Sequence, residues 1–210
     1  MPRPMLAAAL VGILVAAARA EAQGPIEVGG GLAFAALENG GDFWGDGVKH
    51  VGAEVHATLP LTQRFGLDLS TTVGHRNLRR QQYSPVRIEG GEIRRTEGMY
   101  TINVRQRIGR RTPGTSYGFA SYGLAGLFST TSYAPLRETY PNGQVDTYPG
   151  STSSNHLAPG FPVVGGGFQK ELSPRLAVRA DTIVLFFLYI PVGFRASATA
   201  VVPLGQWTTR

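Results

Sequence analysis

The chain has 210 residues, which corresponds to one domain, and only 16% of them are charged, against about 25% in ordinary soluble domains. It contains 28 Gly and no Cys, which excludes disulfides, thiol nucleophiles, cysteine-ligated metals and a lipid-modified N-terminal cysteine. The net charge of +6 includes Arg3 and Arg19 of a predicted leader. Without these two arginines the chain has 18 basic and 14 acidic residues, and this excess of positive charge is too small to indicate a nucleic-acid partner.

The first 20 residues have the pattern of a cleaved secretory signal peptide of the Sec type. Arg3 supplies the positive charge, residues 5–18 are small or aliphatic, and Ala18-Arg19-Ala20 fits a cleavage site. The apolar run is too short to span about 30 Å of hydrocarbon as a helix. The predicted division is therefore a signal peptide at 1–20 and one barrel domain at 21–210, with cleavage after Ala20 or after Ala22.

The rest of the chain contains eight segments in which apolar and polar residues alternate, the pattern of strands with two different faces. In chain order the segments are 26–37, 49–60, 65–75, 97–108, 116–128, 161–172, 175–186 and 191–204. In the second, for example, Val51 and Val55 are predicted to face outward, and Glu54 and His56 inward. In the eighth, Val192 and every second residue up to Val202 are predicted to face outward.

The connections between these segments alternate in length. Those at 60–64, 109–115 and 173–175 are short, those at 38–48, 76–96 and 129–160 are predicted as long loops, and the last, near 187–190, is short. This pattern predicts an all-β fold, an eight-stranded antiparallel up-and-down transmembrane β-barrel with both termini in the periplasm. The alternative is a soluble lipocalin-like barrel, whose apolar faces point inward to bind a small apolar ligand.

Two stretches, GGGFQKELSPRLAVRADT at 165–182 and PVGFRASATAVV at 191–202, resemble the last hairpins of small eight-stranded outer-membrane barrels of the OmpA/OmpX, porin-like type. The resemblance implies a monomeric barrel in the outer membrane of a Gram-negative-type bacterium. It also implies contact with outer-membrane lipid, lipopolysaccharide and the outer-membrane assembly machinery. It leaves the molecular activity open.

Charged residues are predicted to gather in the lumen of this barrel. The eight are Glu27, Glu54, Asp68, Asp181, Arg105, Arg107, Arg179 and Arg195. Because eight strands leave room only for side chains and unpaired buried charges are costly, we expect a salt-bridged filled lumen. A gated ion path through a rearranging ion pair is the alternative.

Residues 76–95 form a strongly basic segment, predicted as a loop. Its arginines are Arg76, Arg79, Arg80, Arg87, Arg94 and Arg95. On the cell exterior they would contact lipopolysaccharide phosphates, and the alternative is a solvated mobile loop. Residues 129–160 are predicted as a variable surface loop, with adhesion or phage reception as the functional alternative. The apolar run 186–189 is predicted to continue its strand into the outer leaflet, with a hydrophobic ligand portal as the alternative.

Catalytic motifs are missing from the sequence. The four histidines form no His-x-Ser dyad, and HExxH, GxSxG and phosphate-loop motifs are absent. The sequence predicts a non-enzymatic protein without a cofactor or metal, with a role in envelope integrity, surface interaction or limited permeability. A lipid-modifying barrel enzyme is a further alternative.

Overall fold

The computed structural model describes residues 25–37, 48–79, 85–109 and 116–204. The predicted signal peptide and the connections 38–47 and 110–115 lie outside the described residues. No helix in the described part of the chain is long and apolar enough to span a membrane.

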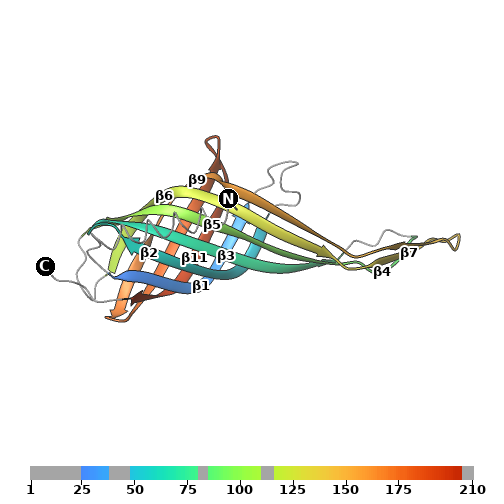
Figure 1. Ribbon diagram of the computed structural model, residues 1–210, viewed down its shortest axis with the longest axis horizontal. Coiled ribbons are helices and arrows are strands. Elements are labelled where there is room, and N and C mark those ends of the chain that lie inside the picture. The colour runs from blue at the N-terminus through green and yellow to red at the C-terminus, as the bar shows by residue number, and fades with distance from the viewer. Residues whose placement is uncertain (1–24, 38–47, 80–84, 110–115, 205–210) are drawn as a thin grey trace, which may run out of the picture.

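Eight antiparallel strands close into one barrel, as predicted (Figure 1). They are β1 (Ile26–Leu37), β2 (Val48–Pro60), β3 (Phe65–Arg79), β5 (Glu92–Ile108), β6 (Ser116–Tyr133), β9 (Ser151–Ser173), β10 (Leu176–Phe187) and β11 (Ile190–Leu204). Around the ring the order is β1-β11-β10-β9-β6-β5-β3-β2. Each strand pairs with its neighbours along the chain, and β1 closes the ring against β11. Closure removes the edges that a sheet would otherwise present.

The two faces of the barrel differ sharply in polarity. Large apolar side chains such as Leu32, Val55 and Phe168 are exposed on the outer face, while polar and charged residues are buried inside. Alternation along each strand produces this division, because successive side chains point to opposite faces. The arrangement is the reverse of the lipocalin-like alternative, which requires an apolar interior.

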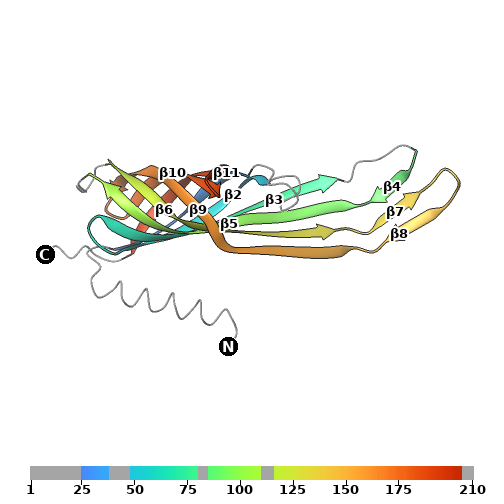
Figure 2. The ribbon, with the colours of Figure 1, turned by 90° about the horizontal axis from the view of Figure 1, so that it is seen from above.

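The prediction of loops at 76–96 and 129–160 is wrong for most of both segments, which form strands. The strands β3, β5, β6 and β9 continue beyond the barrel as a four-stranded arm, paired as far as Arg79↔Glu92 and Tyr133↔Ser151. A three-stranded sheet of β4 (Arg87–Gly90), β7 (Leu136–Thr139) and β8 (Val145–Tyr148) forms the end of the arm (Figure 2). Both faces of the arm carry polar residues, so the alternation used to recognise strands is lost there.

Strand connections at the end of the barrel where β1 begins and β11 ends are short. In the β2–β3 turn the Leu61 and Thr62 amides donate to the Phe65 carbonyl, and in the β9–β10 turn the Arg175 amide donates to Ser173 Oγ. At the opposite end, the arm occupies one half of the ring, and β10 and β11 are joined by the two residues Leu188 and Tyr189.

A small apolar cluster lines the lumen towards the arm. It consists of Met99, Ala125, Leu127, Val163, Ile183 and Leu185. Val192, predicted to face outward, packs against this cluster instead. The reason is a register irregularity between Leu185 and Phe186, which reorients the start of β11.

Candidate functional site

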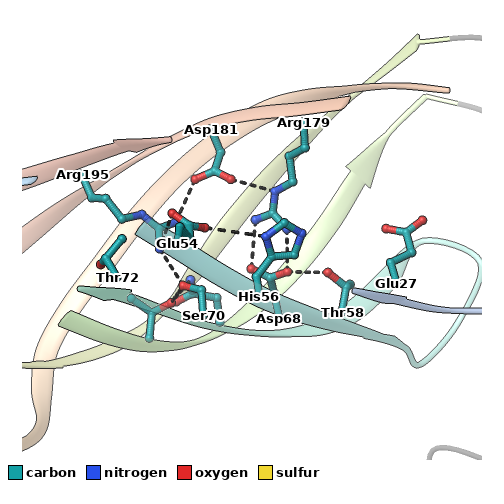
Figure 3. Close-up of polar contacts among 12 residues, drawn as sticks. Glu27, Glu54, His56, Thr58, Asp68, Ser70, Thr72, Arg179, Asp181 and Arg195 are labelled. Atoms are coloured by element: carbon teal, nitrogen blue, oxygen red, sulfur yellow. Dashed lines mark hydrogen bonds and ion pairs between the residues drawn. The ribbon is translucent and has the colours of Figure 1, made fainter. Parts of the chain in front are cut away.

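A network of buried ion pairs crosses the lumen, and Arg179 is its centre (Figure 3). Arg179 Nη1 and Nη2 donate to the two oxygens of Asp68 at 2.7 and 2.9 Å, and Nε donates to Asp181 Oδ2 at 2.7 Å. Arg179 is on β10 and Asp68 on β3, four strands apart in the ring of eight, so this bidentate pair joins opposite walls of the barrel. Asp68 is completely buried and also accepts a hydrogen bond from Thr58 Oγ1.

Arg195 extends the network along β11. Its Nη2 donates to Asp181 Oδ1 at 2.8 Å and its Nη1 donates to Ser70 Oγ at 2.6 Å. Glu54 Oε2 lies 3.5 Å from Arg195 Nη1, an ion-pair distance. Arg195 has no exposed surface, so its charge is balanced entirely by these carboxylates.

Arg105 holds the end of the lumen nearest the short turns. Its Nη2 donates to Gln169 Oε1 at 2.7 Å and to the Tyr117 hydroxyl at 3.1 Å, and its Nη1 lies 3.5 Å from Glu27 Oε2. The guanidinium carbon also sits 3.9 Å from the centre of the Phe119 ring, a cation–π arrangement. Residues from β1, β6 and β9 therefore converge on the side chain of this β5 residue.

His56 fills the space beside Glu54. Its Nδ1 lies 3.8 Å from Glu54 Oε1. The ring lies over Gly29, where an added Cβ would approach the imidazole to 2.4 Å. Glycine at this position makes room for the histidine inside the barrel.

Seven of the eight residues predicted for the lumen come together in this network. Arg107 is the exception: its Nη1 donates to the Gln63 carbonyl at 3.0 Å, and its guanidinium lies 4.7 Å from the Tyr117 ring centre. It therefore sits at the rim by the β2–β3 turn. Of the eight predicted lumen residues, three arginines and four carboxylates are buried, in place of the predicted balance of four arginines and four carboxylates.

A second buried cluster lies near the arm and was missed by sequence analysis. Glu97 is contacted by Arg95 Nε at 3.0 Å, by Arg76 Nε at 3.5 Å and by His50 Nδ1 at 3.6 Å. Glu97 is the first residue of the predicted strand 97–108, and the sequence analysis gives no direction for its side chain. Its inward direction follows from the two-residue alternation from Arg105 back along β5.

The arginines predicted to contact lipopolysaccharide divide into two groups. Arg76 and Arg95 turn inward to Glu97, whereas Arg87 and Arg94 are exposed on the arm. The side chains of Arg79 and Arg80 lie outside the described residues. A hollow of about 420 Å³ next to Arg94 is also lined by His75, Asn77, Leu78 and Glu92.

The contacts that these groups make are ion pairs and hydrogen bonds. Among the described residues, no three His, Asp or Glu side chains are placed to hold a metal ion. His50 and His56 each lie beside a carboxylate, and within the described part of the chain neither imidazole forms a hydrogen bond with a serine. The arrangement is one of opposite charges that pair with one another inside the barrel.

Comparisons with known proteins agree with this architecture. The family model described as "Outer membrane protein beta-barrel domain" matches residues 5–182. No curated protein sequence matched the chain.

Among solved structures, Ail, the attachment invasion locus protein of Yersinia pestis, is 14% identical. The match covers 86% of this chain and 98% of Ail, with a TM-score of 0.47. The N-terminal β-barrel domain of Pseudomonas aeruginosa OprF is also 14% identical, with the same coverage and a TM-score of 0.46. Neisserial surface protein A is 10% identical over 85% of this chain and 96% of its own, with a TM-score of 0.38.

The family match covers most of the described barrel, including the residues Asp68, Arg105, Arg179 and Asp181. The chain therefore belongs to the outer membrane protein β-barrel family, and it is an eight-stranded barrel of the outer membrane.

Proposed function

We propose that this protein is a non-enzymatic outer-membrane barrel whose lumen is closed by its own ion pairs, and that it serves the integrity and surface of the envelope. The observation that carries the proposal is the bidentate Arg179–Asp68 pair between opposite walls. An eight-stranded barrel is only just wide enough for its side chains, so a pair across its full width leaves no continuous aqueous path. Arg105 and Arg195 block the levels on either side.

A solute-flux measurement tests this proposal. The protein is refolded into liposomes, and swelling is followed in a small sugar and in potassium chloride. We expect swelling at the rate of empty liposomes. A matched variant, D68G/R179G, removes both cross-lumen side chains and should admit ions. Rapid swelling with the unaltered protein would overturn the closed lumen.

Limited ion permeability is a second candidate, favoured by the position of Glu54. Arg195 lies between Asp181 at 2.8 Å and Glu54 at 3.5 Å, so a small rotation exchanges one carboxylate partner for the other. Such an exchange would open a path without leaving the arginine unpaired. Ion flux that disappears in E54Q and persists in the exposed-site variant R175Q would support this candidate.

We further propose that both termini face the periplasm and that the arm projects from the cell. Short turns on the side of the termini and long extensions on the other are typical of bacterial outer-membrane barrels. The exposed Arg87 and Arg94, with the hollow beside Arg94, would then contact lipopolysaccharide phosphates. Protease added to intact cells should cleave the arm and leave the β2–β3 and β9–β10 turns uncut. Cleavage at those turns would reverse the orientation.

A further inference from the structure

The turn between β10 and β11 has an unusual backbone for its residues. Leu188 and Tyr189 have φ angles of 53° and 94°, both in the left-handed region. Two-residue hairpin turns of this type favour Asn-Gly, because bulky side chains are strained at positive φ. Tyr189 is 97% exposed and Leu188 72% exposed, so contacts within the protein do not explain the choice of residues.

The turn is also the centre of an exposed apolar surface. Phe187 and Ile190 flank it and are 55% and 65% exposed, so four consecutive large apolar side chains are exposed, of which Phe187 also contacts the Phe161 ring. We call these four residues, 187–190, the apolar turn. From Thr182 to Phe194 the chain has no charged residue. Connections at the other end are polar by comparison: Leu-Thr-Gln-Arg at 61–64 and Pro-Arg at 174–175.

The surface next to the apolar turn indicates what covers it. The outward residues of the same hairpin, among them Val178, Val184, Phe194 and Val202, form part of the apolar belt of the barrel. The apolar turn continues this belt without a polar interruption. A tyrosine at its tip suits the boundary between hydrocarbon and headgroups, because its ring is apolar and its hydroxyl polar.

We propose that the apolar turn inserts into the outer leaflet and holds this half of the barrel rim at membrane level. Its ligand is therefore the acyl chains and upper headgroup boundary of the bilayer. The other half of the rim, formed by β3, β5, β6 and β9, rises as the polar arm (Figure 2). The backbone strain at Leu188 and Tyr189 is retained because these side chains contact lipid. The assignment to the outer leaflet rests on the orientation proposed above. Insertion of the apolar turn into lipid does not depend on whether the lumen is closed.

Site-specific quenching tests this proposal, and the chain has no cysteine to interfere with labelling. Single variants I190C, V55C on the apolar belt and N142C at the end of the arm are labelled with the fluorophore NBD. Each is refolded into phosphatidylcholine vesicles with or without a nitroxide-bearing lipid. We expect the label at 190 to be quenched by that lipid at least threefold more strongly than the label at 142, and to resist iodide as the label at 55 does.

Two results would overturn the proposal. One is a label at 190 that responds to iodide as the label at 142 does, which would place the apolar turn in water. The other is protection from both quenchers, which would indicate that protein, such as a second copy of the chain, covers the apolar turn.

A second variant separates insertion from fold. L188N/Y189G, made in the I190C background, supplies the preferred residues for this turn and removes the two apolar side chains. We expect lipid quenching at 190 to fall by half or more, with the unfolding midpoint in urea unchanged or raised. Unchanged lipid quenching would contradict insertion by these side chains. Ion flux through the barrel should be unaffected, so a failure of the closed-lumen proposal remains distinguishable.

Discussion

Replacing Arg179 with methionine breaks the pair with Asp68 that joins opposite walls of the barrel, while keeping a similar apolar volume. Three charge-assisted hydrogen bonds are lost, two to Asp68 and one to Asp181. Asp68 has no exposed surface, so its charge is left in the interior with a weaker set of partners. Loss of one partner from a buried pair typically costs about 3–5 kcal/mol, and we expect R179M to lower the free energy of unfolding by that amount.

The assay is urea unfolding of the protein refolded into phosphatidylcholine vesicles, followed by fluorescence and by migration on unboiled gels. R175M, at the exposed β9–β10 turn, is the matched control and should change the free energy of unfolding by less than about 0.5 kcal/mol. Adding D68N to R179M removes the stranded charge and should recover at least about 1 kcal/mol. A loss in R179M no larger than that in R175M would refute the argument that the pair is buried and dry.

Two other predictions follow from packing and surface charge. G52A should lower the free energy of unfolding by about 1–3 kcal/mol in the same urea assay, because the new Cβ would meet neighbouring backbone at 2.0 Å. The control G118A should be tolerated, because the nearest atom to its new Cβ is at 3.8 Å. Equal effects of the two substitutions would contradict the prediction. R87A and R94A should each weaken binding of detergent-refolded protein to lipopolysaccharide about fivefold in low salt, since an arginine near an anionic lipid surface contributes about 1 kcal/mol. R175A, at the other end of the barrel, should bind as the unaltered protein does, and a loss independent of ionic strength would argue against phosphate contacts.

The membrane-level part of the fold was predictable from the sequence because lipid and lumen impose opposite polarities on successive residues. The first strand has the predicted bounds, Ile26–Leu37. Strands β2 and β11 differ from prediction by one residue at one end, and β10 differs by one residue at each end. The arm was not predictable in this way. In β9, residues 151–156 read Ser-Thr-Ser-Ser-Asn-His, and every one of them is exposed, so no contrast between faces remains to mark a strand.

The lumen charges were largely predictable for the same reason, since a two-residue period fixes which side chains point inward. Their pairing was not, because Arg179 and Asp68 are 111 residues apart and meet only when the ring closes. Arg107 obeys the alternation but lies beyond the interior, at the level of the β2–β3 turn. Height along the barrel depends on strand tilt and stagger, which single-strand patterns do not contain.

The arginine-rich segment illustrates a related limit. Arg94 and Arg95 are adjacent in sequence, yet Arg94 is exposed and Arg95 is held by the buried Glu97. Prediction as a loop gave all six arginines one role. In the structure the segment contributes to three strands, β3, β4 and β5, and alternation along β5 separates Arg94 from Arg95. Among the described side chains of the six, Arg87 and Arg94 are the exposed pair.

Single-channel recording of the refolded protein in a planar bilayer tests the central claim, a barrel closed by its own ion pairs, most directly. With insertion verified by heat-modifiable migration of the same sample, we predict a baseline without resolved conductance steps in 1 M potassium chloride. D68G/R179G, which removes the side chains across the full width of the lumen, should produce steps in the same apparatus. Stable open-channel steps from the unaltered protein, at a frequency that scales with the amount inserted, would contradict the account.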